Sequence, residues 1–123
     1  MNLFLHHIYE YKKGLRNLVL HTINTIHRKE IVQKLEKEGI SYIIRGVSSA
    51  KLNVFFGDRN CINVLETFGP KPLNEFTDEE DFILGIMLGY CRKKQCRRYL
   101  SRKGRMRREN GFDTRDRAIA RSA

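Results

Sequence analysis

Apolar and polar residues alternate between helical and extended spacing along the first part of the chain. Asn2–Lys13 places its apolar side chains at helical spacings and stops at Gly14, which predicts a short first helix. Leu15–Ile23 is rich in Leu, Val and Ile and alternates with a period of two, which predicts a strand. The chain therefore begins with a helix followed by a strand.

The next segment predicts a second helix and a β-hairpin. Asn24 or Thr25 can cap a helix whose apolar positions follow the helical period and which closes at Gly39. Ile40–Val47 and Lys51–Gly57 are strand-like runs separated by a short polar segment, a pattern typical of two strands joined by a turn.

A third helix is predicted after the hairpin, with Asp58 as its cap and Gly69 and Pro70 at its end. The central order of elements is therefore βαββα, which matches most of a split βαβ, or ferredoxin-like, sandwich. We expect an α+β fold with three strands in the order one, three, two and helices on one face. The strand that would complete the motif is missing, so the edge of the first strand needs another cover.

A long helix is the best-specified element of the chain. It is predicted to begin at Thr77, where Thr77 and Glu80 form a capping box, and to run to about Leu100 or Arg102. Its first turn is acidic and its last turns are basic, as the helix dipole favours. The intervening Phe82–Cys91 is apolar all the way round, which indicates burial on every side.

The net charge of +10 lies at one end of the chain. Residues 1–91 hold eleven basic and eleven acidic side chains, whereas residues 92–123 hold thirteen basic and three acidic ones. We expect a single globular domain at residues 1–100 and a basic, flexible tail at residues 101–123, which has few apolar groups to bury. A neutral body with a cationic extension attracts polyanions through that extension.

Composition also narrows the location of the protein. The longest uncharged apolar run is shorter than the about 20 residues that a membrane-spanning helix needs. The N-terminus lacks the features of a signal peptide. Three cysteines form no disulfide framework and fit a reducing compartment. We therefore expect a cytoplasmic protein without a membrane segment.

No catalytic, cofactor or metal-binding motif is recognised, and we expect no enzyme and no cofactor. Asp78–Asp81 are consecutive helical positions that point about 100° apart, so they suit the helix N-terminus better than a metal ion. Cys91 and Cys96 lack partners for a four-ligand zinc set and are interpreted as free thiols. A redox-reactive thiol at Cys96 stays open, because basic neighbours lower a thiol pKa.

The candidate partner-binding residues are the basic side chains of the last helix and the tail. Arginine outnumbers lysine in this region, and arginine binds phosphate oxygens bidentately and stacks on bases. Nucleic acid is therefore slightly favoured over an acidic protein, and a solubilising extension without a partner is the alternative. The candidate residues are Arg92, Lys93, Lys94, Arg97, Arg98, Arg102, Lys103, Arg105, Arg107 and Arg108.

Gly85 and Gly89 form a G-x-x-x-G step in the long helix. They either pack within the chain or let the same helix of a second copy approach closely. An antiparallel crossing near this step would place each acidic block beside the partner's basic block. The dimer interface would then comprise Phe82, Gly85, Ile86 and Gly89. A competing dimer pairs the bare edge of the first strand across the two-fold axis.

Four segments resemble an uncharacterised bacterial family known as a domain of unknown function. They are Glu10–Thr22, Asn53–Asp58, Leu73–Tyr90 and Gln95–Leu100, within a likeness that covers roughly residues 8–103. The resemblance implies an α/β fold of three strands and about five helices, a homodimer, and gene neighbourhoods with flavodoxin. It carries over no catalytic residue.

We therefore expect a small, homodimeric, non-enzymatic binding module whose cationic C-terminal segment engages an acidic partner. The resemblance adds an alternative, an accessory partner of an acidic flavoprotein such as flavodoxin. Cys91 or Cys96 near a bound flavoprotein gives another alternative, a thiol-based redox accessory protein.

Overall fold

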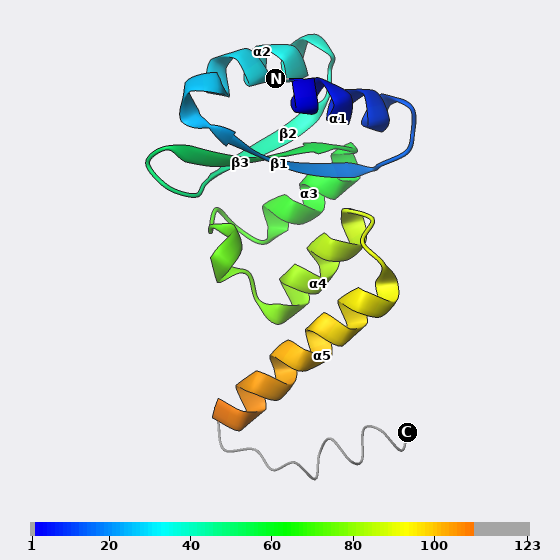
Figure 1. Cartoon of the computed structure of the whole chain (residues 1–123), viewed down its shortest axis with the longest axis vertical. Helices are drawn as coiled ribbons and strands as arrows, with labels where there is room; N and C mark the ends of the chain where they lie inside the picture. The colour runs from blue at the N-terminus through cyan, green and yellow to red at the C-terminus, as the bar shows by residue number, and fades with distance from the viewer. Residues whose placement is uncertain (1, 110–123) are drawn as a thin grey trace.

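The computed structural model describes residues 2–109 and places a three-stranded sheet between helical layers (Figure 1). Side chains are described as far as Gly104. Short 3-10 helices are labelled η. The elements are α1 (Asn2–Lys12), β1 (Leu18–Asn24), η1 (Thr25–His27), α2 (Arg28–Lys37), β2 (Ser41–Gly46), β3 (Lys51–Gly57), α3 (Arg59–Thr67), η2 (Leu73–Glu75), α4 (Asp78–Met87) and α5 (Arg92–Glu109).

The sheet has the strand order β1-β3-β2, with β3 antiparallel to both neighbours. This confirms the predicted α+β class and strand order. Gly57 ends β3 beside both Leu18 and Ser41. A Cβ at Gly57 would lie 2.3 Å from the carbonyl oxygen of Asn17, and its φ is +148°, so this strand end requires glycine.

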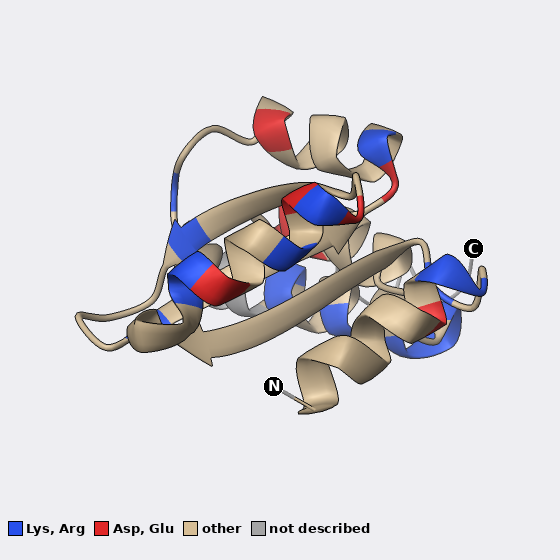
Figure 2. Cartoon of the chain, turned by 90° about the horizontal axis from the view of Figure 1, so that it is seen from above, with Lys and Arg blue, Asp and Glu red and all other residues tan. Residues whose placement is uncertain are grey.

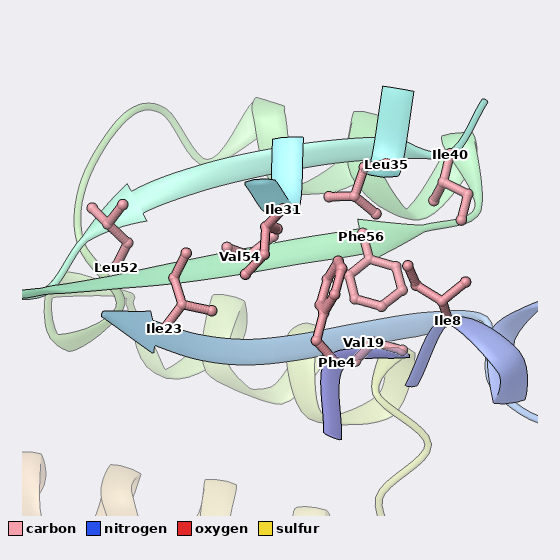
Figure 3. Packing of buried hydrophobic residues seen from close by; sticks show 10 residues of the cluster. All are labelled: Phe4, Ile8, Val19, Ile23, Ile31, Leu35, Ile40, Leu52, Val54 and Phe56. Atoms are coloured by element: carbon pink, nitrogen blue, oxygen red, sulfur yellow. The ribbon is translucent and has the colours of Figure 1, made fainter. Parts of the chain in front are cut away.

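Helices cover both faces of the sheet, so the expectation of helices on one face is wrong. Helices α1 and α2 lie above the sheet in Figure 1, and α3 lies below it, followed by α4 and α5. The upper core joins Phe4 of α1 and Leu35 of α2 to Val54 and Phe56 of β3 (Figure 3). The lower core joins α3 and α4 to the opposite face, and its buried residues are Leu18, Ile43, Phe55, Ile62, Leu65, Phe76, Leu84 and Leu88.

The sequence of β3 explains why helices pack on both faces of the sheet. Leu52, Asn53, Val54, Phe55 and Phe56 are all buried along β3. Successive side chains of a strand point to opposite faces, so a continuous buried run needs a cover on each face.

The predicted caps at Asp58 and Thr77 are confirmed, whereas Asn24 caps η1 and not α2, whose N-cap His27 makes no side-chain cap hydrogen bond. The Asn24 side chain accepts a hydrogen bond from the Ile26 amide at 3.1 Å, and Asp58 accepts one from the Asn60 amide at 3.0 Å. Thr77 and Glu80 form the complete capping box, with each side chain bound to the other's backbone N–H. Such caps typically contribute about 1 kcal/mol each.

The predicted single long helix is wrong, because it breaks into α4 and α5 at Gly89. The Gly89 amide donates to the Ile86 carbonyl and the Tyr90 amide to the Gly85 carbonyl, both at 3.0 Å, while Gly89 has a φ of +84°. These two bonds are the Schellman motif that ends helices at a left-handed glycine. The chain then turns, and α5 begins at Arg92.

The segment that we expected to be irregular from Ser101 onward is helical as far as Glu109, which corrects that expectation for residues 101–109. The rest of the predicted tail, residues 110–123, lies outside the described residues. The division into domain and tail stays a prediction. Within residues 2–109, no helix is long and apolar enough to cross a membrane.

Candidate functional site

The basic helix α5 folds back along α4, and this hairpin contains most of the candidate binding residues (Figure 1). Gly85 lies against the Gln95 side chain, and the Phe82 and Tyr99 rings meet edge to face with centroids 5.5 Å apart. Residues near the end of α4 thus contact residues early in α5, and residues near its beginning contact later ones. The acidic first turn of α4 therefore lies beside the middle of α5.

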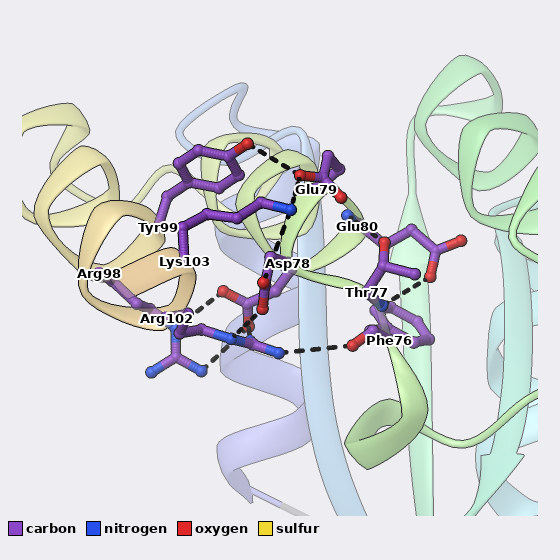
Figure 4. Close-up of polar contacts among 10 residues, drawn as sticks. Phe76, Thr77, Asp78, Glu79, Glu80, Arg98, Tyr99, Arg102 and Lys103 are labelled. Atoms are coloured by element: carbon purple, nitrogen blue, oxygen red, sulfur yellow. Dashed lines mark hydrogen bonds and ion pairs between the residues drawn. The ribbon is translucent and has the colours of Figure 1, made fainter. Parts of the chain in front are cut away.

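Two aspartates and two arginines form an ion-pair cluster at this junction (Figure 4). Arg98 donates to both carboxylate oxygens of Asp81, at 2.8 and 3.0 Å. Arg102 reaches Asp78 at 2.8 Å and Asp81 at 2.9 Å. The bidentate contact between Arg98 and Asp81 is the strongest geometry that arginine and carboxylate adopt. Hydrogen bonds from Arg98 lower the pKa of Asp81, and Asp81 in turn raises the pKa of Arg98.

A second group of contacts extends the hairpin by one turn. Lys103 lies 2.7 Å from the Glu79 carboxylate, and the Tyr99 hydroxyl donates to the same carboxylate at 2.8 Å. The hydrogen bond from Lys103, followed by that from Tyr99, lowers the pKa of Glu79. The hydrogen bond to Glu79 raises the pKa of both Tyr99 and Lys103. Three basic residues of α5 are thus neutralised by acids of the same chain.

The candidate binding residues therefore divide into two sets. Arg98, Arg102 and Lys103 face the acids of α4. By contrast, four basic residues near the start of α5 are exposed and make no ion pair within the described part of the chain. We call them the exposed basic group: Arg92, Lys93, Lys94 and Arg97. The side chains of Arg105, Arg107 and Arg108 lie outside the described residues.

The two glycines of the G-x-x-x-G step have distinct roles within the chain. A Cβ at Gly85 would lie only 1.6 Å from the Gln95 amide nitrogen, so the glycine makes room for that side chain. Gly89 ends α4, as described above. Glycine inside a helix costs about 1 kcal/mol relative to alanine. A dimer interface at Phe82, Gly85, Ile86 and Gly89 stays a prediction, although the charge pairing that favoured it occurs here between α4 and α5 of one chain.

The body of the protein carries no comparable excess of one charge. Acidic and basic residues are mixed along the helices that cover the upper face of the sheet (Figure 2). Lys12 and Lys34, for example, both bind Glu38, at 2.8 and 3.1 Å. Among the described residues, the excess of positive charge is therefore concentrated on α5.

The cysteines are free thiols with different surroundings. Burial, followed by the charge of Asp58, raises the pKa of the partly buried Cys61. Cys91 and Cys96 are exposed at the start of α5. Among residues 2–109, no three His, Cys, Asp or Glu side chains gather as a metal site. A reactive thiol at Cys96 stays a prediction.

Comparison with known proteins identifies a family. The sequence model of a family described as "Protein of unknown function (DUF2023)" matches residues 2–102. The match covers the sheet, the helices around it and the ion-pair cluster. No curated protein matches the chain.

Replacing Asp81 with Asn should loosen α5 from α4. The change removes the charge that binds Arg98 and Arg102 but keeps the side-chain volume. Because Arg98 is partly exposed, we expect a loss of about 1–2 kcal/mol, measured as faster amide hydrogen exchange throughout α5. Glu75→Gln is the matched control, since no ion pair within the described residues involves Glu75.

Lowering the pH should also loosen α5 from α4 in the unmodified protein. The lowered pKa of Asp81 means that its ion pair stabilises the hairpin fully above the unfolded carboxyl pKa of about 4. This stabilisation is lost as the pH falls through the lower folded value. The Asp81→Asn variant should therefore show a weaker acid response in α5, and an unchanged response would contradict the assigned role.

Proposed function

The chain belongs to this family, whose description names no activity, and we propose that it is a small, non-enzymatic module that binds nucleic acid through α5. The observation that carries the proposal is the division of charge on α5. One set of basic residues is neutralised within the chain, and the exposed basic group faces outward.

The spacing of the exposed basic group suits a repeating anionic partner. Lys93 and Arg97 are four residues apart, and Lys94 and Arg97 are three apart, so these side chains share one face of the helix. Between Arg92 and Arg108, α5 contains no acidic residue that would repel an anion. Its 18 residues give a rod about 27 Å long, which can follow several phosphates of a nucleic acid.

Contacts of this kind bind phosphates and do not read the base sequence. We therefore expect affinity without sequence preference and with a strong dependence on salt. The log of the affinity should fall by about 0.9 per phosphate contact for each tenfold rise in salt on duplex DNA, and by about 0.7 on a single strand.

We place this activity in the bacterial cytoplasm, because free cysteines fit a reducing compartment. An acidic flavoprotein such as flavodoxin presents negative charge to α5, as a nucleic acid does. It is the competing partner that the binding experiment must include.

Reversing two charges on α5 should weaken nucleic-acid binding. We expect Lys93→Glu/Lys94→Glu to bind a fluorescent 20-mer duplex more weakly than the unmodified chain and to reduce the salt slope by about two. Lys29→Glu/Lys37→Glu makes the same change in net charge on exposed positions of α2 and should bind almost normally.

Equal losses in both variants would show that only net charge matters and would overturn the site. Affinity for flavodoxin together with none for the duplex at low salt would replace nucleic acid by the acidic protein.

We further propose that the protein is a homodimer formed through the outer edge of β1. The sheet order leaves β1 with one hydrogen-bonding side unpaired, and β1 contains no Lys, Arg or Pro of the kind that protects edge strands. Helix α1 packs on β1, and its Leu5 and Tyr9 are exposed. Antiparallel pairing of two β1 strands would satisfy two-fold symmetry and extend the sheet.

Light scattering should give a mass of two chains for the unmodified protein and of one chain for Leu5→Glu/Tyr9→Glu. The matched control, Ile83→Glu/Leu100→Glu, changes two exposed apolar residues on the α4–α5 hairpin and should stay dimeric. The reverse pattern would move the interface to the hairpin, and a monomeric unmodified protein would exclude the dimer.

A further inference from the structure

A groove of about 940 Å³ lies between the lower face of the sheet, the η2 segment and the α4–α5 hairpin. Leu20 of β1, Leu84 of α4 and Leu88, the C-cap of α4, give it apolar walls. Two side-chain amides, from Asn53 of β3 and Gln95 of α5, also line it. Volumes and mixed linings of this kind are typical of small-molecule sites.

The Gln95 amide occupies the space left by the missing side chain of Gly85. Gln95 is only 7% exposed, and its amide lies where a side chain at position 85 would otherwise be. Glycine has a lower intrinsic helix propensity than alanine, and α4 carries this cost at position 85 to make room for the amide. No hydrogen bond to this amide is found among residues 2–109. Since no side-chain nitrogen or oxygen in that part of the chain is both fully buried and unpaired, the amide faces the groove.

Asn53 presents a second amide from the opposite wall. It is 6% exposed, and its Oδ1 accepts a hydrogen bond from the Thr22 hydroxyl at 2.6 Å. This bond fixes the side chain, and its NH₂ group has no acceptor among the described residues. Two amides that are more than nine-tenths buried, on separate elements, therefore offer hydrogen bonds to an occupant of one groove.

The charges of the groove select a neutral occupant. Its charged lining residues are Asp78, Asp81, Arg98 and Arg102, and the ion-pair cluster neutralises all four. A phosphate would have to break these pairs. A side-chain amide carries a donor and an acceptor side by side, which matches the hydrogen-bonding edge of a nucleobase. Tyr90, a lining residue that is 53% exposed, offers a ring on which a base can stack.

We propose that this groove binds a nucleobase, held by the Asn53 and Gln95 amides between apolar walls. The base can belong to a free nucleoside or to an unstacked nucleotide of a single strand. This site is separate from the exposed basic group, and it goes beyond the proposed function, which involves phosphates alone.

The side-chain NH₂ signals of Asn53 and Gln95 in an NMR spectrum report on the groove directly. Adenosine, uridine and ribose are each titrated into the full chain. We expect at least one nucleoside to shift both signals, and ribose to shift neither. Unchanged signals with every nucleoside and with a single-stranded octanucleotide would overturn the proposal.

Two variants test the assigned residues. Gln95→Met keeps the volume but removes the amide and should weaken nucleoside binding at least tenfold, whereas Gln33→Met on α2 should not change it. Gly85→Ala adds a Cβ where the Gln95 amide lies and should displace that amide, which would weaken binding; a circular dichroism spectrum checks that the variant stays folded. Undiminished binding in both Gln95→Met and Gly85→Ala would contradict the site.

An octanucleotide and its abasic analogue distinguish the two sources of the base and separate this proposal from the first one. A shift of both NH₂ signals by the octanucleotide but not by the abasic strand supports a single-strand source. A shift by the nucleoside alone supports a free ligand. Equal affinity for both strands with unchanged NH₂ signals leaves phosphate binding by α5 standing and rejects the groove as a base site.

Discussion

The ion pairs between α4 and α5 decide which charges of this protein face outward. The Schellman turn at Gly89 reverses the chain, and the aspartates of the first turn of α4 then meet the arginines of α5. An isolated helix as polar as α5 buries little apolar surface, so its position depends on these contacts and on the Phe82–Tyr99 pair. The cluster also forms one end of the groove that Gln95 and Asn53 line.

One helix thereby serves two purposes. Its inner side holds the hairpin together through neutralised pairs, and its exposed basic group lies on a surface that no acid of the described chain occupies. The body contributes a balanced surface, so the proposed polyanion would be drawn to α5 and not to the body. The proposed nucleobase site lies on the other side of the same pairs. Phosphates and bases would then be recognised by different parts of the hairpin.

The sequence predicted the fold class, the strand order and the caps of α3 and α4, because each depends on local signals such as Asp58 before a helix or Thr77 with Glu80. The prediction from the sequence was wrong where contacts between distant residues determine the structure. The G-x-x-x-G step suggests that Gly89 packs either within the chain or against a second copy, although glycine after an apolar helical run is equally a C-terminal cap. Missing that cap made α4 and α5 a single helix, so the acid–base pairing within the chain was not foreseen. The buried Gln95 had no sequence signal apart from Gly85, since their contact exists only after the turn forms.

Lysine acetylation under limiting reagent, read by mass spectrometry, shows which basic residues of α5 face outward. Lys93 and Lys94 are exposed, whereas Lys103 is held by Glu79. We expect fast modification of Lys93 and Lys94, slow modification of Lys103, and protection of the first two alone when nucleic acid is added. Equal rates for the three lysines, or protection that falls on Lys103 and spares Lys93 and Lys94, would show that the ion pairs do not decide which charges of α5 face outward.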